Sequence, residues 1–370
     1  MKPRKSKWHR KAQASLRKLR LRLWRAGLLP HPLPSGCHER ISAWVAKEMA
    51  AWAGFDPNTA QAAAELDRLN RCSPEISIYR ISGREVVQVP KPNGFFDRMI
   101  EERAGFYLRH LEAALQGSRR GVDASIAVFL GDGAFDDASI PVFSFQKPRG
   151  HRAILLPDVD FLWSEYYQSA KWDDPFPYSS KTNTASFVGA TTGSGSVSGS
   201  AQIKAENARA LDWPPRLKSF AHFRGNPRVS FQLPLIVHCD APETEHILEQ
   251  QGIGGGLMRS WPMQFAGRFI ISMDGNGAAC SRVVIALKSH CVLLKYDSDS
   301  ILYYFHGLEP WKHYIPIASD AEVESVLDAE ERGTSHAAIA EEGRKFANAM
   351  LNREAVLFYT CQLLEAYGRS

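Results

Sequence analysis

The chain of 370 residues is long enough for two domains, and its composition, 44% hydrophobic and 23% charged, is that of a globular protein. Residues 1–30 contain eleven Lys and Arg and no acidic residue, so the net charge of +5 arises there, and the rest of the chain has 34 basic against 40 acidic side chains. An acidic body argues against a nucleic-acid-binding protein. No apolar run approaches the roughly 20 residues that span a bilayer, and the N-terminus lacks the apolar core of a signal peptide.

The six cysteines are scattered along the chain without a CxxC pair, which indicates neither a zinc site nor a disulfide framework. They are Cys37, Cys72, Cys239, Cys280, Cys291 and Cys361. We therefore expect reduced thiols in a cytoplasmic protein.

The N-terminal segment, residues 1–30, has the pattern of a basic amphipathic helix, because Leu16, Leu19 and Leu23 recur at helical spacing and Trp24 lies on an adjoining stripe. Such a helix can lie in the interface of an anionic membrane, where each basic group near the surface adds about 1 kcal/mol. It can equally pack on its own domain as a solvated helix. The sequence leaves both interpretations open.

After Pro34, strand patterns alternate with helix patterns. This alternation is typical of open α/β sheets, whose ligands bind outside the carboxyl ends of the strands. The predicted helices cover residues 39–53, 57–69, 96–115, 243–251, 278–289, 321–329, 335–351 and 354–367. The predicted strands cover residues 76–89, as a hairpin with its turn at Ser82-Gly83, and residues 126–130, 140–145, 153–156, 184–188, 233–239, 268–274 and 291–295.

Asp132 follows one of these strands and stands between Gly131 and Gly133. An aspartate between glycines is commonly a turn residue. Asp132 also stands at the carboxyl end of a strand, where open α/β sheets bind ligands. The residues alone favour the turn role.

Residues 181–204 are rich in Gly, Ser and Thr, a composition typical of a flexible linker. The competing interpretation is a turn that cradles a phosphate, because the strand at 184–188 runs directly into the GATTG string at 189–193. Both interpretations stay open at this point.

The predicted strand at 268–274 is followed by a turn with Gly275 and Gly277 and then by a helix. Backbone N–H groups at the start of such a helix, near Ala279, point at a bound anion, and the helix dipole adds to the attraction. Arg282 lies one turn into the helix, close enough to reach the same anion.

Three strings in the C-terminal third resemble the signature of glycosyltransferase family 90, which includes protein O-glucosyltransferases, fungal capsule-associated transferases and bacterial lipopolysaccharide-modifying transferases. They are DGNGAACSR at 274–282, VLLKYDS at 292–298 and EPWKHYIPI at 309–317. The resemblance implies an α/β fold of the GT-B type, with two Rossmann-like lobes, the nucleotide-sugar site in the cleft, and C-terminal helices that cross back to the first lobe. The implied domains are 31–182 on the acceptor side, 183–350 on the nucleotide-sugar side, and a helix at 351–370.

The same resemblance implies the site residues. It places the catalytic base on Asp132, upstream of the IPVFSF string at 140–145. Bacterial members carry WRGATTG where this chain has Phe187 and Val188 before GATTG, and an arginine downstream matches Arg228, with Arg216 and Arg224 as alternatives. The donor-binding residues so implied are Gly189, Thr191, Thr192, Gly193, Arg228, Asp274, Gly275, Ala279, Ser281 and Arg282.

The resemblance also bears on metal and cofactors. Two Asp-x-Asp pairs, Asp158 with Asp160 and Asp297 with Asp299, have the form that holds a divalent ion in other glycosyltransferases. The resembled family does not depend on metal, so we expect neither metal nor cofactor, and we interpret both pairs as surface or loop acids.

The implied function is an inverting transfer of a hexose or pentose from a UDP-sugar to a hydroxyl of a glycan acceptor, in lipopolysaccharide or surface polysaccharide synthesis. The rival hypothesis is a non-catalytic protein that binds nucleotide-sugars, which Val188 favours and Asp132 disfavours. No nucleic-acid partner is expected.

Overall fold

The computed structural model describes residues 33, 35–95, 97–193, 202–255 and 260–369, so the predicted N-terminal amphipathic helix lies outside the described residues. The chain forms two compact units. The first runs to Leu130 and also takes in Asp137–Phe143 and Arg353–Ser370, and the second consists of Gly131–Asp136 and Ser144–Asn352. The second unit therefore begins well before the predicted boundary at residue 183.

The first unit contains a sheet in the order β2-β1-β3-β4. The predicted hairpin is confirmed, because β1 pairs with β2 in antiparallel register that closes at Ser82 and Glu85. β3 is antiparallel to β1 and parallel to β4. The elements are α2 (Ser35–Met49), η1 (Ala50–Trp52), α3 (Ala60–Cys72), β1 (Ile76–Gly83), β2 (Glu85–Gln88), α4 (Arg98–Leu115), β3 (Val122–Phe129), β4 (Val142–Ser144) and α13 (Arg353–Tyr367).

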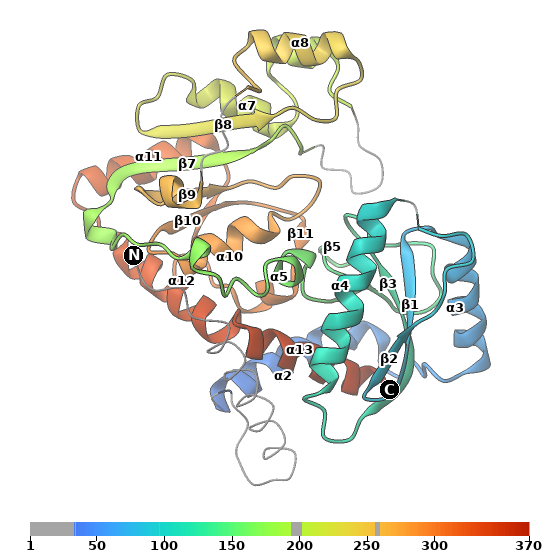
Figure 1. The fold of residues 1–370 in the computed structure, drawn as a ribbon. Helices are drawn as coiled ribbons and strands as arrows, with labels where there is room; N and C mark the ends of the chain where they lie inside the picture. Colours follow the sequence, from blue (N-terminus) through green and yellow to red (C-terminus); the bar gives the residue numbers. More distant parts are fainter. Residues whose placement is uncertain (1–32, 34, 96, 194–201, 256–259, 370) are drawn as a thin grey trace. The chain divides into compact units, whose positions relative to one another are not determined.

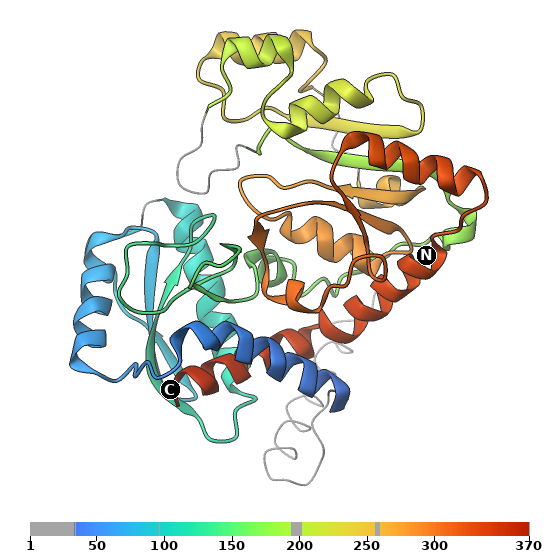
Figure 2. The ribbon, with the colours of Figure 1, turned by 180° about the vertical axis from the view of Figure 1, so that it is seen from behind.

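The C-terminal helix α13 belongs to the first unit, where it lies beside α2 (Figure 2) and packs on α4. Its inward side is apolar, and the ring of Tyr367 packs edge-on against Phe143 at 5.2 Å. His110 of α4 is fully buried and its Nε2 lies 2.8 Å from the hydroxyl of Thr360 on α13. The contact gives a buried polar group its partner, as a well-packed interior requires.

The second unit contains a five-stranded sheet in the order β12-β10-β9-β7-β8, and every pairing in it is parallel. Its strands are largely continuous runs of buried apolar residues, as is typical of parallel strands that are covered by helices. α10 and α12 pack together on β10, while α7 packs on β8 and α11 on β7 (Figure 1). Their bounds are β7 (Thr182–Ala190), α7 (Pro215–Phe223), β8 (Val229–Leu235), β9 (Gly267–Ser272), α10 (Cys280–Lys288), β10 (Val292–Tyr296), β12 (Ile315–Ile317), α11 (Asp320–Glu331) and α12 (Ala337–Met350).

Shorter elements complete the second unit. They are β5 (Lys147–Pro148), β6 (Ile154–Leu155), α5 (Val159–Trp163), η2 (Ala170–Trp172), η3 (Tyr178–Ser180), α6 (Ala205–Ala210), α8 (Pro242–Gln250), α9 (Trp261–Gln264), β11 (Ser300–Ile301) and η4 (Tyr303–Gly307). The prediction of a strand at 233–239 is displaced, because β8 starts at Val229 and the chain leaves the sheet before His238, whose φ of 62° is not a strand conformation. Among the described residues, no helix has both the length and the apolar character needed to span a membrane.

Candidate functional site

Most of the predicted site residues of the second unit, but not Arg228, gather where its parallel strands end. β7 runs into the turn of Gly189 to Gly193, β9 is followed by Asp274, and β10 ends next to it, since Lys295 pairs with Ser272. Because a carbon added at Gly193 would lie 3.5 Å from the carbonyl oxygen of Asp274, the turn after β7 lies directly against the turn after β9. This is the sheet edge at which open α/β proteins bind ligands.

Arg216 reaches this edge from α7. It is 6% exposed, and its guanidinium donates three hydrogen bonds: from Nη1 to the carbonyl of Ala190 (3.0 Å) and the hydroxyl of Thr192 (2.6 Å), and from Nη2 to the carbonyl of Met273 (2.9 Å). These bonds join the turn after β7 to the turn after β9. The sequence had left Arg216 as one of three alternatives, and the structure brings this one to the site.

Arg282 reaches the same edge from α10. Its Nη2 donates to the carbonyl of Val188 (2.6 Å), and its Cζ lies 4.2 Å from the centre of the Phe187 ring. The Arg216 guanidinium lies 5.2 Å from the same ring. Phe187 is therefore an aromatic neighbour of both cations, which favours their charge.

Neither guanidinium has a carboxylate within ion-pair distance among the described residues, and the Nε of each is buried without a hydrogen-bond partner. Burial and then repulsion by Arg282 lower the pKa of Arg216 to about 9, and burial lowers the pKa of Arg282 to about 10. In both cases the carboxylate of Asp274 opposes the shift. Two cations that repel each other, one buried and one partly buried, form a site with a deficit of negative charge.

Glycines allow the two arginines to approach the backbone. A Cβ at Gly189 would lie 3.2 Å from Nη2 of Arg282, and a Cβ at Gly275 would lie 3.0 Å from Nη2 of Arg216 and 2.8 Å from the hydroxyl of Thr192. A Cβ at Gly277 would meet the buried side-chain amide of Gln146 at 2.3 Å. The glycines at these positions serve close packing rather than chain flexibility.

The start of α10 is occupied by carboxylates of the chain itself. The carboxylate of Asp274 accepts from the N–H of Ala279, and the carboxylate of Asp160 accepts from the N–H of Ser281 at 3.1 Å. The helix end that the sequence predicted to be open to an anion thus has these two N–H groups satisfied, as helix ends in folded proteins generally must be.

Of the two alternatives for Asp158, a surface or a loop acid, the structure excludes the first. Asp158 is fully buried, and its carboxylate accepts the N–H groups of Asp160 and Phe161 at 3.1 and 3.3 Å, which caps α5. Burial, and then the neighbouring charge of Asp160, raise the pKa of Asp158 well above its usual range. Asp158 therefore fixes the helix that carries Asp160 to the start of α10.

Asp132 is half-buried and belongs to the second unit, as do the two arginines. Its carboxylate acts on Cys280 at the start of α10, whose thiol pKa is raised well above the usual value by burial and then by the carboxylates of Asp158, Asp160, Asp132 and Asp274. Four carboxylates therefore act on the first residue of α10. Asp132 lies close enough to this helix start to be among them.

Arg228 does not lie at this edge. It precedes β8, at the opposite end of the parallel strands, where its Nη1 pairs with Asp328 (2.8 Å) and Glu331 (3.0 Å) of α11. Arg224 is exposed and donates to the carbonyl of Gln251 at 2.5 Å. The insertion between the GATTG turn and α7 had obscured the alignment, and of the three arginines only Arg216 contacts the two turns among the described residues.

Other predicted residues have structural partners. Thr191 is fully buried, and its hydroxyl donates to the carbonyl and accepts from the N–H of Val237. Asp297 and Asp299 are exposed, in line with their interpretation as surface acids. Within the described part of the chain, no three His, Cys, Asp or Glu side chains are arranged to hold a metal ion.

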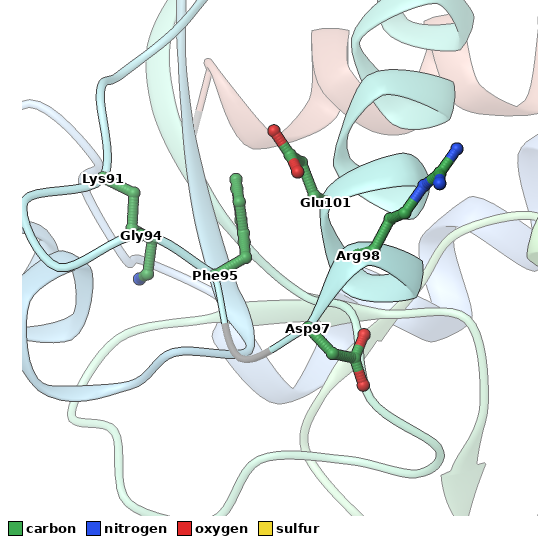
Figure 3. Close-up of a pocket in the computed structure, with 6 residues that line it drawn as sticks. All are labelled: Lys91, Gly94, Phe95, Asp97, Arg98 and Glu101. Carbon is green, nitrogen blue, oxygen red and sulfur yellow. The ribbon is translucent and has the colours of Figure 1, made fainter.

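The first unit has an open cavity of about 550 Å³ between the end of β2 and the start of α4 (Figure 3). Its lining residues are Lys91, Gly94, Phe95, Asp97, Arg98 and Glu101. Lys91 is held by the carbonyls of Asn70, Ser73 and Ile76. None of the predicted site residues lines this cavity, which is distinct from the sheet edge of the second unit.

Sequence reasoning missed Lys295 at the site. It is 7% exposed at the end of β10, and it neighbours Asp274 closely enough for that carboxylate to act on its pKa. The sequence did contain a signal, a lysine directly after the apolar strand residues Val292 to Leu294. A lysine on a buried parallel strand is rare unless it has a partner or a functional role.

The pattern of Glycosyl transferase family 90 matches residues 131–370. Part of the chain is also similar to protein O-glucosyltransferase 3 of Homo sapiens and protein O-glucosyltransferase 2 of Danio rerio, in each case with 31% identity over 106 residues. These alignments cover 28% of this chain and 21% of each relative, so the matched stretch spans about a fifth of the relatives' length.

Proposed function

Because the chain belongs to glycosyl transferase family 90, we propose that it transfers a hexose or a pentose from a UDP-sugar to a hydroxyl of a glycan acceptor, with inversion at the anomeric carbon. The observation that carries the proposal is the pair of guanidiniums at the carboxyl edge of the sheet, from the buried Arg216 and the partly buried Arg282, with no carboxylate within ion-pair distance among the described residues. A diphosphate supplies the negative charge that this pair lacks.

In this proposal the diphosphate lies between the two arginines and the turn after β7. Each guanidinium keeps donors beyond those bonded to backbone carbonyls, and the Thr192 hydroxyl, which accepts from Arg216, has a proton to donate. Charge-assisted bonds of this kind are stronger than neutral ones and hold the donor before reaction. The arginines take the charge-neutralising role that a divalent ion has in other transferases, so no step requires a metal.

Asp132 is the general base of the proposed reaction. Its carboxylate accepts the proton of the acceptor hydroxyl as that oxygen forms a bond to the anomeric carbon. The bond from this carbon to the diphosphate oxygen breaks on the opposite face, and UDP leaves with the electron pair. The developing negative charge on UDP is stabilised by Arg216 and Arg282, which are already in place before the reaction.

The acceptor class that we propose is lipopolysaccharide or another surface polysaccharide, on the basis of the bacterial resemblance of the GATTG string. The names of the relatives make glucose the first donor sugar to test. Contact of residues 1–30 with an anionic membrane stays a prediction. The rival proposal, a protein that binds the nucleotide-sugar without transfer, is favoured by Val188, which stands where bacterial members have arginine.

The test measures UDP release from UDP-glucose, UDP-galactose and UDP-xylose, with and without glycan fractions. We expect release by the parent protein and a loss of roughly 100-fold or more in Asp132→Asn, the usual scale for removal of a general base, with UDP affinity unchanged. Asp136→Asn is the matched control, because Asp136 lies in the same stretch but is exposed and pairs with His151. Absence of UDP binding in calorimetry would overturn the proposal, and equal turnover in Asp132→Asn would place the general base elsewhere. A parent protein that binds UDP-sugars but releases no UDP would leave only the binding function.

A further inference from the structure

Lys295 is a buried cation that the transfer mechanism has not used. Its side chain is 7% exposed, its ammonium donates to the carbonyl of Tyr296 at 3.3 Å, and it lies 4.9 Å from the centre of the Phe305 ring. No carboxylate lies within ion-pair distance of it in the part of the chain that the structure describes. An ammonium has three donors, so Lys295 retains bonding capacity inside the protein.

Asp274 faces Lys295 from the neighbouring strand end. Its carboxylate is held by the hydroxyl of Ser298 and the N–H of Ala279, which fixes its orientation. Burial lowers the pKa of Lys295 and raises that of Asp274, and each charge opposes the shift of the other. The further charged groups that act on Lys295 are Arg149, which lowers its pKa, and Asp297, which raises it.

Lys295 and Asp274 are thus close enough to interact through space but do not form a direct ion pair. A donor and an acceptor held apart in this way suit a group with adjacent hydroxyls, one of which can donate to the carboxylate while another accepts from the ammonium. The carboxylate of a sugar acid or a phosphate would instead be repelled by Asp274. The pair therefore favours a neutral polyhydroxyl ligand.

The strand order places this pair beside the arginines. β9 lies between β7 and β10, the two guanidiniums contact the end of β7, and Lys295 lies at the end of β10. Arg216 also donates to the carbonyl of Met273, next to Asp274. Asp274 therefore stands between the proposed diphosphate site and Lys295.

We propose that Lys295 and Asp274 bind hydroxyls of the transferred sugar, a neutral hexose or pentose, and so distinguish the UDP-sugar from UDP. This inference rests on the proposed function, because it assumes that a diphosphate occupies the two arginines. Ser298 positions Asp274 and does not itself contact the sugar, since its hydroxyl is already bonded to Asp274 and to the backbone of Ser300.

The test compares the affinities for UDP and for UDP-glucose and UDP-xylose by calorimetry, in an Asp132→Asn background that prevents turnover. We expect Lys295→Met to weaken UDP-sugar binding about ten-fold and to leave the UDP affinity within two-fold of the parent. Lys288→Met is the matched control, because Lys288 is also a partly buried lysine of this unit but lies at the far end of α10. It should leave both affinities unchanged.

Each outcome bears on the inference. Equal weakening of UDP and UDP-sugar would make Lys295 a phosphate contact, and an unchanged preference for UDP-sugar would remove it from the site, so both overturn the inference while the proposed function stands. A parent protein that binds UDP-sugars no more tightly than UDP overturns it as well. If Lys295→Met fails to fold, Lys295→Gln and Asp274→Asn answer the same question. A parent that binds no UDP contradicts the proposed function itself.

Discussion

The two ends of the parallel sheet in the second unit differ in whether their cations have carboxylate partners. At the amino end, Lys181 pairs with Asp174 at 2.8 Å, Arg268 with Glu330 at 2.9 Å, and Arg228 with Asp328. At the carboxyl end, Arg216, Arg282 and Lys295 have no carboxylate partner among the described residues. The same sheet thus neutralises its positive charge at one end and leaves it uncompensated at the other.

The difference indicates which end is built for stability and which for binding. A buried charge without a partner costs free energy, and a fold that retains several of them at one place gains something other than stability there. The carboxylate of Asp274 opposes the pKa shifts of all three cations but forms an ion pair with none of them, so it relieves the deficit only in part. An anionic ligand at the carboxyl end would complete the charge balance that the amino end achieves with its own side chains.

The largest expected effect is at the amino end. Lys181→Met would leave the buried carboxylate of Asp174 without its cation, since the two side chains are 0% and 1% exposed. Removing one partner of a buried ion pair costs about 3–5 kcal/mol. Urea unfolding should show a loss of this size, with a control, Lys171→Met at an exposed site, within about 1 kcal/mol of the parent. A loss below about 1 kcal/mol for Lys181→Met would contradict the description of this end as structural.

The next effect is on ligand binding at the carboxyl end. Arg282→Met or Arg216→Met should weaken UDP binding by roughly 10- to 150-fold, because a charge-assisted contact to phosphate contributes about 1.5–3 kcal/mol. Arg228→Met is the matched control at the amino end, and its UDP affinity should equal that of the parent. The UDP affinities of these variants, measured by calorimetry, show at which end of the sheet the diphosphate binds. Weakening by Arg228→Met, with Arg216→Met unchanged, would place the diphosphate where the sequence first put it.

Much of this site was predictable from the sequence, because its parts are local. The strand, the glycine turn and Arg282 follow one another within 15 residues, and the strings at 189–193 and 274–282 identify the two turns that the structure brings together. Hydrophobic periodicity likewise predicted the long helices, such as α4 and α12, to within a few residues.

The remaining features depend on contacts that no local pattern encodes. The choice of Arg216 over Arg228 depends on which end of the sheet each side chain reaches, and residues 194–211 between the turn and α7 hide the register. The burial of Asp158 was not predictable, because an Asp-x-Asp pair has the same sequence whether it is exposed or buried. Asp160 is at the site because its carboxylate meets Ser281, 121 residues away.

A smaller effect is expected where backbone and guanidinium are in close contact. In Gly189→Ala, the new methyl group would lie 3.0 Å from the Phe187 ring and 3.2 Å from Nη2 of Arg282, so the guanidinium must shift by a few tenths of an ångström. We expect UDP affinity to fall by roughly 3- to 10-fold, less than on removal of the charge. Gly105→Ala on α4, whose nearest contact would be an ordinary 3.5 Å, should not change it. An unchanged affinity in Gly189→Ala would mean that the position of Arg282 is not critical.

The smallest expected effect is the change in the free energy of unfolding when Arg282 is replaced. It is the most direct test of the comparison, because removing a cation should destabilise the amino end but not the carboxyl end. Burial lowers the pKa of Arg282 to about 10, so the folded protein binds this proton less tightly than the unfolded chain, and the cost is fully present at neutral pH. Arg282→Met removes that cost together with one hydrogen bond to Val188, and urea unfolding without ligand should therefore change by less than about 1 kcal/mol, or show a gain. UDP at 100 times the parent's Kd should stabilise the parent by about 2.7 kcal/mol, but Arg282→Met, with its roughly 10- to 150-fold weaker binding, by only about 0.3–1.4 kcal/mol. If Arg282→Met instead loses as much stability as Lys181→Met, Arg282 is a structural residue like those at the amino end, and the argument from uncompensated charge fails.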